Sequence, residues 1–198
     1  MGTIRSAKTA LRLEIKKKIQ LMNSDQKVNQ SKLVTEKVIN SQYFKESNRI
    51  SIYISRSDEV QTFDLLRKIF DLGKLCFVPR YSTESNHMDM VRLYSIEEVN
   101  NFSKTKWNIT QPDEEDEREN ALSTGGLDLI FVPGMAFSKA GKRLGRGKGF
   151  YDKFLKECIA SQRVPATTVG LAFDEQIFQD IPTDLHDFKL DIIVYPYD

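Results

Sequence analysis

The sequence predicts one α/β domain over residues 1–198, with helices on both faces of a mostly parallel central sheet. The first supporting observation is a strand, a helix and a strand in that order over residues 49–78, which is typical of a parallel βαβ unit. The second is a short uninterrupted apolar run at residues 127–132, as expected of a strand buried on both faces. The third is the lack of repeats and low-complexity linkers in a chain of 198 residues, a length that suits one core.

The first forty residues predict two amphipathic helices. In residues 4–22 apolar side chains recur every three or four positions, and lysines and arginines take the other face. That stripe consists of Ile4, Ala7, Leu11, Ile15, Ile19 and Met22. Asn23, Ser24 and Asp25 then offer capping side chains for a second helix. Its stripe consists of Val28, Leu33, Val34, the stem of Lys37, and Val38.

Residues 49–78 predict the βαβ unit in detail. Residues 49–54 alternate polar and apolar side chains, which indicates a strand. Thr62 is expected to cap a helix that runs through Phe70 and is ended by Gly73. Residues 75–78 predict a short apolar strand that Pro79 stops. The order implies a parallel strand pair with a right-handed crossover.

The rest of the chain adds four strands and one helix. Residues 88–93 predict a strand, and residues 105–120, which are acidic and aperiodic, predict a long exposed loop. Residues 127–132 predict a buried strand that ends at Pro133 and Gly134. A helix is expected over residues 148–160, and the last two strands over residues 167–173 and 190–195.

The charge balance excludes strong steering toward nucleic acid or a membrane surface, because 29 basic residues offset 28 acidic ones. No apolar run approaches the ~20 residues that span a bilayer. Residues 1–18 lack the apolar region of a secretory signal, although their basic amphipathic character leaves a mitochondrial presequence as an alternative. Cys76 and Cys158 lie in apolar segments and are expected to be buried and reduced, which favours the cytoplasm. We expect a monomer that acts on small molecules, with no nucleic-acid or membrane partner.

Residues 143–152, Arg-Leu-Gly-Arg-Gly-Lys-Gly-Phe-Tyr-Asp, are the most informative segment for function. Their alternating glycines let an anion approach the backbone amides, and Arg143, Arg146 and Lys148 add positive charge. The spacing matches neither the Walker phosphate-binding pattern nor the dinucleotide fingerprint. The segment favours a phosphate site over a plain flexible turn. Asp152 is either a metal ligand or a first-turn acid favoured by the helix dipole, and the pattern does not decide between them.

Other polar segments follow the predicted strands, and ligands of open α/β sheets bind outside the carboxyl ends of strands. We therefore expect these segments at one rim of the sheet: residues 55–59, 79–81, 133–137 and 173–176. Glu59 could hold an amine-bearing ligand, but the pattern alone favours a solvated loop acid. His87 could be a general base or a metal ligand, but His186 is the only other histidine, so a histidine metal cluster is not expected.

Three further positions have two interpretations each. Trp107, in a polar loop, either stacks on a ligand or packs on the core. Asp187 is either a second carboxylate for a cation or a turn acid. Lys8 and Arg12, four residues apart on one helical face, suit a phosphate clamp, but the spacing alone favours an ordinary solvated basic face.

Five segments in this order resemble those of one known family. They are Lys8-Thr9-Ala10-Leu11-Arg12, Pro79-Arg80-Tyr81, Asn86-His87-Met88-Asp89-Met90, Trp107-Asn108-Ile109 with Gln111-Pro112, and residues 144–152. Nearly the whole chain resembles 5-formyltetrahydrofolate cyclo-ligase, also called methenyltetrahydrofolate synthetase, of the animal cytosolic kind. The resemblance implies an enzyme that uses ATP and Mg²⁺ to convert 5-formyltetrahydrofolate into 5,10-methenyltetrahydrofolate, ADP and phosphate. The alternative is a folate-binding or regulatory module without ligase activity, which the intact Arg146, Lys148 and Asp152 argue against.

The resemblance also implies roles for single residues. Arg146 and Lys148 are the expected catalytic residues, and Asp152 and Asp187 the expected magnesium ligands. The implied ATP-binding residues are Lys8, Thr9, Ala10, Leu11, Arg12, Arg143, Leu144, Gly145, Arg146, Gly147, Lys148, Gly149, Phe150 and Tyr151. The implied folate-binding residues are Ile54, Glu59, Trp107, Arg146, Gly147, Lys148, Gly149, Phe150 and Tyr151. Among these, Glu59 is expected to accept hydrogen bonds from the pterin amino edge, and Trp107 and Tyr151 to stack on folate rings. Thr110 stands where the family often has proline, a change that removes no functional group.

Overall fold

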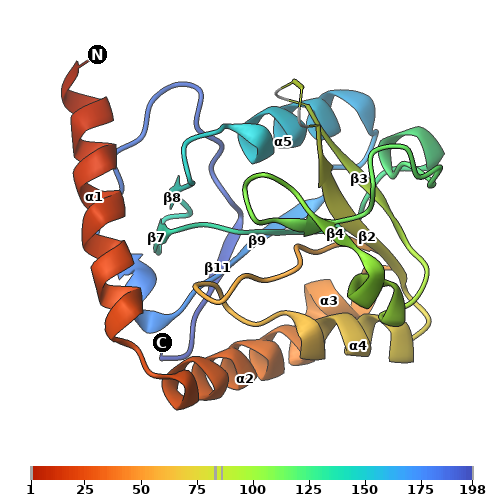
Figure 1. Ribbon diagram of the computed structural model, residues 1–198, viewed down its shortest axis with the longest axis horizontal. Helices are drawn as coiled ribbons and strands as arrows, with labels where there is room; N and C mark the ends of the chain where they lie inside the picture. The colour runs from red at the N-terminus through yellow and green to blue at the C-terminus, as the bar shows by residue number, and fades with distance from the viewer. Residues whose placement is uncertain (1, 83, 86, 198) are drawn as a thin grey trace.

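The centre of the protein is a six-stranded sheet, shown in Figure 1. The computed structural model describes residues 2–82, 84–85 and 87–197. The strand order is β11-β9-β6-β1-β2-β3. The strands are β1 (Arg49–Ser51), β2 (Leu75–Tyr81), β3 (Met88–Leu93), β6 (Leu129–Val132), β9 (Thr167–Leu171) and β11 (Ile192–Val194). All neighbours pair in parallel except β2 and β3, which are antiparallel. The predicted α/β class with a mostly parallel sheet is therefore confirmed.

Helices cover both faces of this sheet (Figure 1). The helices α2 (Ser24–Asn40), α3 (Gln42–Glu46) and α4 (Phe63–Asp71) lie on one face, and α5 (Phe150–Ser161) lies on the other. Strand β6 contributes side chains to the cores on both faces of the sheet. Leu129 and Phe131 join the core under α2 to α4, whereas Ile130 and Val132 join the core under α5. Side chains alternate across a strand, so a run that is apolar at every position is buried on both faces.

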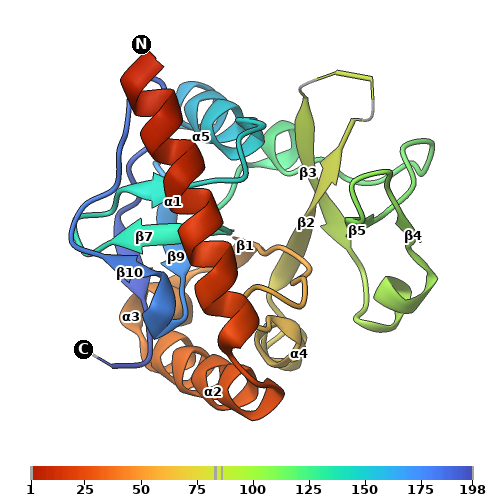
Figure 2. The same cartoon turned by 60° about the vertical axis from the view of Figure 1, so that its left-hand side comes forward.

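Helix α1 (Gly2–Leu21) lies across the edge of the molecule, in front of the smaller sheet in Figure 2. The C-terminal part of its predicted stripe is buried at Ile15, Ile19 and Met22. The N-terminal part is not, because Ile4 and Ala7 are exposed where the helix extends past the core. The prediction that the stripe runs the whole length of the helix is therefore wrong for its first two turns. The segment considered as a presequence is part of the fold.

The helix caps agree with the sequence in one case and not in another. The Asn23 side chain accepts a hydrogen bond from the Gln26 backbone N–H, and the Gln26 side chain accepts one from the Asn23 backbone N–H, which forms a capping box for α2. The Thr62 side chain does not cap α4. Its hydroxyl instead donates to the Tyr53 carbonyl and is fully buried, so it joins the loop after β1 to the start of α4.

Pro79 does not end its strand, contrary to the prediction. β2 continues to Tyr81 because it pairs with β3 along its whole length. The Phe77 carbonyl accepts a hydrogen bond from the Ile52 backbone N–H, so the backbone groups of residue 77 point toward β1. Residues two apart in a strand point the same way, so an N–H at position 79 would also point toward the β1 side. β1 has already ended at Ser51, and the missing N–H of proline therefore removes no hydrogen bond.

Several short elements were not predicted. A three-stranded sheet is formed by β7 (Ala136–Ser138), β8 (Arg143–Leu144) and β10 (Ile177–Phe178), with β7 in the middle. The strands β4 (Ser103–Lys104) and β5 (Thr110–Gln111) pair within and beside the loop expected to be fully irregular. The 3₁₀ turns are η1 (Glu97–Asn101), η2 (Leu122–Thr124) and η3 (Asp174–Gln176). Elements of two to five residues are too short to show a hydrophobic period.

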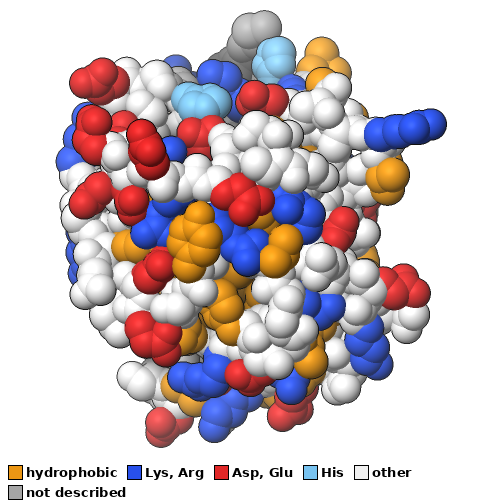
Figure 3. Space-filling view, turned by 90° about the vertical axis from the view of Figure 1, so that its right-hand side faces the viewer, with side chains coloured by type: hydrophobic (Ala, Val, Ile, Leu, Met, Phe, Trp, Pro, Cys, Tyr) orange, Lys and Arg blue, Asp and Glu red, His pale blue; other side chains and the backbone are white. Residues whose placement is uncertain are grey.

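The surface and the cysteines agree with the composition. Figure 3 shows basic and acidic side chains interspersed over the face at the right-hand side of Figure 1. Cys76 and Cys158 are both buried and unpaired, and burial raises the pKa of the Cys76 thiol to about 12. Among the residues that the structure describes, no helix is both long enough and apolar enough to cross a membrane.

Candidate functional site

A cavity of about 1170 Å³ opens where the loops after β1 and β6 meet the N-terminal ends of α1 and α5. The loop after β1 contributes Ile54, Arg56 and Glu59, and the loop after β6 contributes Pro133 and Gly134. These loops follow the carboxyl ends of neighbouring parallel strands, which is where the fold class leads one to expect a ligand. Further walls are formed by residues 143–152, residues 183–187, one face of α1, and side chains from residues 79–81 and 107–110.

The glycine-rich loop leads directly into α5. Gly149 is the N-cap of α5 and has a left-handed backbone, with φ of 72°, and no side chain caps the helix there. Helix N-termini leave backbone N–H groups unpaired, so the start of α5 presents donors and a partial positive charge to the cavity. Gly147 also has a positive φ, of 95°, and a Cβ at that position would lie 3.4 Å from Arg12 Nη2. Both turns therefore require glycine.

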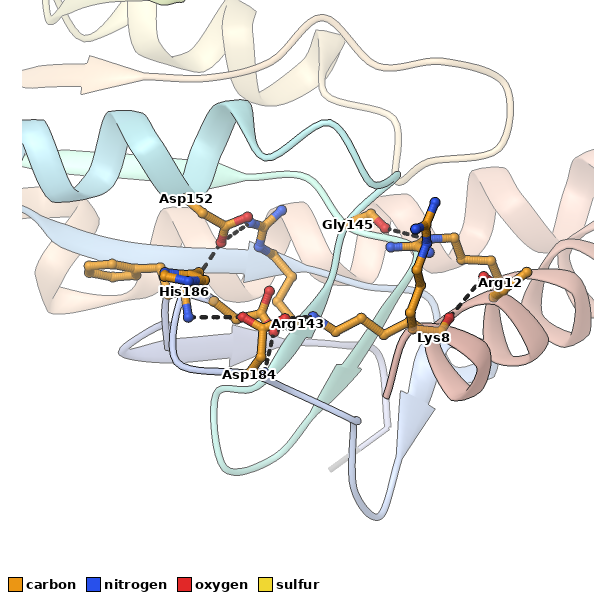
Figure 4. Close-up of polar contacts among 11 residues, drawn as sticks. Lys8, Arg12, Arg143, Gly145, Asp152, Asp184 and His186 are labelled. Carbon is orange, nitrogen blue, oxygen red and sulfur yellow. Dashed lines mark hydrogen bonds and ion pairs between the residues drawn. The ribbon is translucent and has the colours of Figure 1, made fainter. Parts of the chain in front are cut away.

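Arg143, on β8, holds Asp152 in the first turn of α5 (Figure 4). Arg143 Nη2 donates to Asp152 Oδ1 at 2.7 Å, and Arg143 Nη1 donates to the Pro133 carbonyl at 3.1 Å. The Phe188 backbone N–H also donates to Asp152 Oδ1, at 3.1 Å. The Arg143 side chain is only 5% exposed. Of the cations expected to contact ATP, Arg143 is thus the most buried, although its Nε atom has no hydrogen-bond partner among the described residues.

Lys8 and Arg12 project from α1 toward the same cavity (Figure 4). Lys8 Nζ lies 2.8 Å from Asp184 Oδ2 and 2.6 Å from Asp187 Oδ2. Burial alone would lower the pKa of Lys8, but hydrogen bonds to these two carboxylates raise it. Arg12 Nε donates to the Gly145 carbonyl at 2.9 Å, which ties α1 to the glycine-rich loop. The interpretation of this helix face as a merely solvated basic surface is therefore wrong.

Arg146 extends from the glycine-rich loop to the loop after β1. Its Nη2 atom donates to Glu59 Oε1 at 3.0 Å and to Asp58 Oδ1 at 2.9 Å. Glu59 is buried, and its second oxygen accepts the Arg56 backbone N–H at 3.0 Å. Burial opposes charging, yet the charges of Glu59 and Asp58 raise the pKa of Arg146. Glu59 is therefore a fixed, ion-paired carboxylate and not a solvated loop acid.

Aromatic rings form another wall of the cavity. The Phe150 ring centroid lies 4.9 Å from that of Tyr81, edge to face, and 5.9 Å from that of Trp107. Lys148 Nζ lies 5.5 Å from the Trp107 ring centroid. Tyr151 lines the cavity but is buried, and the Arg143 guanidinium covers its ring at 5.9 Å. Trp107 is half-buried, so it offers more ring surface to a ligand than Phe150 or Tyr151, which are both buried.

The cavity gathers most of the residues singled out from the sequence. The expected ATP, folate and metal residues that line it are Lys8, Arg12, Ile54, Glu59, Trp107, Arg143, Leu144, Gly145, Arg146, Gly147, Lys148, Gly149, Phe150, Tyr151, Asp152 and Asp187. Thr9, Ala10 and Leu11 do not line it: the first two are exposed, and Leu11 packs beside β8. Asn86 lies outside the described residues, and His87 pairs with Asp89 at 3.0 Å, away from the cavity.

The structure also adds residues and removes one segment. Arg5, Tyr53 and Asp184 line the cavity without any distinguishing sequence signal, and Asp184 is recognisable only by its contact with Lys8. Residues 173–176, expected at the rim, turn away from it. Gln176 is buried and donates to the carbonyls of Gly134 and Met135, so it braces the loop after β6 from behind.

A divalent cation would find two carboxylates here. Among the described residues, no group of three or more His, Cys, Asp or Glu side chains could hold a metal. Asp152 Oδ2 and Asp187 Oδ1 nevertheless accept no hydrogen bond within the described part of the chain, whereas the other oxygen of each carboxylate is engaged. Mg²⁺ is commonly bound by one or two carboxylates together with substrate phosphates, so this donor set fits a metal that arrives with a polyphosphate.

Comparisons with known proteins point to one family. Residues 4–196 match the model of the 5-formyltetrahydrofolate cyclo-ligase family. The chain is 53% identical to a 5-formyltetrahydrofolate cyclo-ligase of Mus musculus over 193 residues, covering 98% of this chain and 95% of that protein. It is 37% identical over 198 residues to a probable 5-formyltetrahydrofolate cyclo-ligase of Caenorhabditis elegans, covering 98% and 95%. An NMR structure of Aquifex aeolicus 5,10-methenyltetrahydrofolate synthetase superimposes with a TM-score of 0.75 at 29% identity, covering 94% of this chain and 88% of that one.

Proposed function

The chain belongs to the 5-formyltetrahydrofolate cyclo-ligase family, and we propose that its cavity binds ATP with Mg²⁺ beside 5-formyltetrahydrofolate and joins the formyl carbon to N10. The observation that carries the proposal is the glycine-rich loop, which lines one cavity together with the start of α5, basic side chains and aromatic rings. A reaction between a polyphosphate and a flat heterocycle needs both surfaces within one cavity.

The phosphate half of the proposed site consists of cations and backbone donors. Lys8, Arg12, Arg146 and Lys148 line one continuous cavity with the N-terminus of α5. Charge-assisted hydrogen bonds from such groups are the usual means of holding phosphate oxygens. Magnesium, held by Asp152 and Asp187 together with phosphate oxygens, would neutralise the charge that develops on them.

The folate half of the proposed site consists of ring surface and one buried acid. Trp107 and Phe150 would pack against the flat pterin, and Glu59 would accept hydrogen bonds from its amino edge. The Glu59 carboxylate is held by the Arg56 backbone N–H, so it is already oriented before a ligand arrives. Ile54, at the same loop, would add apolar contact.

The proposed reaction has two steps. The formyl oxygen attacks the γ-phosphorus, the bond to the bridging oxygen breaks, and ADP leaves. N10 then attacks the activated formyl carbon, the carbon–oxygen bond breaks, and phosphate leaves with that oxygen and the N10 proton. Arg146 and Lys148 would stabilise the charge on the transferring oxygens, because such transfers depend mostly on positioning and electrostatics. The rings of Trp107 and Phe150 would fix the heterocycle so that N10 faces the formyl carbon.

Substitution of Lys148 tests this assignment. We expect Lys148→Ala to lower turnover of 5-formyltetrahydrofolate at least tenfold, which equals about 1.4 kcal/mol of barrier or more. Formation of methenyltetrahydrofolate is followed by its near-ultraviolet absorbance, with and without Mg·ATP. The matched control is Lys156→Ala, because Lys156 is an exposed lysine on α5, the helix that follows the loop, and does not line the cavity. Parental turnover in Lys148→Ala would refute the assignment, and turnover without ATP would refute the proposed reaction.

Cellular context forms the last part of the proposal. We place the reaction in the cytoplasm, where two buried thiols would remain reduced, and we expect the chain to act as a monomer. Sedimentation of the purified protein with and without Mg·ATP measures its oligomeric state directly.

A further inference from the structure

One ion pair connects the two halves of the cavity. Arg146 lies on the glycine-rich loop, on the phosphate half, and Glu59 lies on the loop after β1, on the folate half. These two groups are bonded to each other, at 3.0 Å. The facing atoms, Arg146 Nη2 and Glu59 Oε1, are therefore engaged with each other and compete with the ligands that the two groups are expected to bind.

We propose that nucleotide and folate bind this enzyme with positive coupling, because each ligand has to break the Arg146–Glu59 pair and the second ligand finds it already broken. This inference rests on the proposed function, which assigns Arg146 to phosphate and Glu59 to the pterin. Whichever ligand binds first bears the cost of separating the two charges. Coupling of this kind is reciprocal, so ATP tightens folate binding by the same factor by which folate tightens ATP binding.

The burial of Glu59 and the exposure of Arg146 explain why the two groups separate when a ligand binds and do not move together. The Glu59 side chain is 7% exposed, and the backbone N–H of Arg56 holds its other oxygen. The carboxylate therefore stays in place when Arg146 moves. Arg146 stands between Gly145 and Gly147 and is 36% exposed, so it is the group that can change partner. Glu59 is then left buried without a cation until an amine-bearing ligand reaches it, which is the state that the second ligand relieves.

The other ion pairs of the cavity do not have this property. Lys8 pairs with Asp187, and Arg143 pairs with Asp152. In both cases the cation and the carboxylate belong to the proposed nucleotide and metal half. The cost of rearranging them falls on nucleotide binding alone and cannot be shared with folate.

Asp58 provides a matched control within the same contact. Its Oδ1 atom accepts from the same Arg146 nitrogen, at 2.9 Å, but its side chain is 37% exposed. Water can replace Arg146 as the partner of Asp58, so the separation of that pair costs little. Asp58→Asn and Glu59→Gln thus remove one negative charge each from the same guanidinium, and they differ in burial and in the role expected toward folate.

The experiment measures binding by calorimetry to the full chain. The ligands are 5-formyltetrahydrofolate and a non-hydrolysable ATP analogue with Mg²⁺, each titrated with and without a saturating amount of the other. We expect the wild type to bind each ligand about tenfold more tightly when the other is present. In Glu59→Gln the ratio should fall below about twofold, and the analogue alone should bind more tightly than to the wild type, because Arg146 has lost its buried partner and keeps only the exposed Asp58. Asp58→Asn should keep the wild-type ratio. Gln can still accept the Arg56 N–H, and circular dichroism checks that each variant is folded.

Two results would overturn the inference, and they differ from failure of the proposed function. If both ligands bind the wild type without mutual effect, or if Glu59→Gln keeps the full ratio, the ion pair does not couple the ligands although the site assignment stands. If the analogue does not bind the wild type at all, the proposed nucleotide site is wrong and the coupling is refuted with it.

Discussion

Arg143 offers the sharpest test of how the site is held together, through its replacement by methionine. Methionine keeps most of the apolar stem and removes the guanidinium, so the change deletes two contacts and little packing. The contact of Arg143 with Asp152 spans 2.7 Å, and the contact with the Pro133 carbonyl spans 3.1 Å. A hydrogen bond between charged groups contributes ~1.5–3 kcal/mol and one to a carbonyl ~1 kcal/mol.

The expected loss is about 3 kcal/mol in the free energy of unfolding. Breaking a fully buried ion pair costs ~3–5 kcal/mol. The Arg143 side chain is 5% exposed but that of Asp152 is 22% exposed, so water relieves part of the cost and the lower end of this range applies. For a chain of 198 residues, ~2–4 °C per kcal/mol converts the loss into a decrease of about 6–12 °C in Tm.

The assay is urea and thermal unfolding followed by circular dichroism, on Arg143→Met, Asp152→Asn and the double variant. The losses in the free energy of unfolding caused by the two single substitutions should add up to at least about 1 kcal/mol more than the loss in the double variant. The reason is that either substitution alone already breaks the same contact. Arg67→Met is the control, because Arg67 pairs with Asp64 across an exposed helix face, where a pair contributes under ~0.5 kcal/mol. A loss in Arg143→Met no larger than in the control, or additive single effects, would refute the reasoning.

Three further predictions concern the glycine-rich loop, the Cys76 thiol and the contact between Lys8 and Asp184. Gly147→Ala should lower both stability, by ~1 kcal/mol, and turnover, because φ is +95° and the added Cβ would lie 3.4 Å from Arg12 Nη2; unfolding and the absorbance assay check this. Burial raises the pKa of Cys76 to about 12, so this thiol should not react with a thiol reagent at pH 8 until the protein is unfolded, and labelling of the native protein would contradict it. The hydrogen bond from Lys8 lowers the pKa of Asp184 below 3.8, so the stability that this contact contributes is present above pH 3.8 and is lost as the pH falls through the lowered pKa. The difference in Tm between wild type and Lys8→Met should therefore shrink below pH 3.8, and a constant difference would argue against it.

Periodicity was sufficient for the long elements and failed where a tertiary partner decides the outcome. The helices over residues 4–22 and 148–160 and the strand over residues 88–93 were predictable because their apolar side chains recur with a regular period, even though the first two turns of α1 stay exposed. The continuation of β2 through Pro79 was not, because it depends on β3 pairing with one edge while β1 has ended on the other. The sheet of β7, β8 and β10 was not predictable for a related reason, since strands of two or three residues are selected by their neighbours.

The site shows the same division between local pattern and long-range contact. The glycines and the start of α5 could be predicted from residues 143–152 alone, because both properties are local. The partners of the charged residues could not be predicted, because they lie far away in the sequence. Arg146 meets Glu59 from 87 positions away, and Lys8 meets Asp187 from 179 positions away. These pairs account for Glu59 and Lys8, for each of which the pattern alone favoured an ordinary solvated side chain.

The pairing of cations with carboxylates also explains how such a cavity can exist before a substrate enters. Half-buried cations placed for phosphate would repel one another and lose hydration, at a cost that a marginally stable chain of this size cannot easily carry. Arg143, Arg146 and Lys8 are each bonded to one or two carboxylates instead, which offsets their charge. A polyanion that binds these three cations exchanges places with carboxylates, and among those are the groups expected to hold the magnesium ion and the pterin.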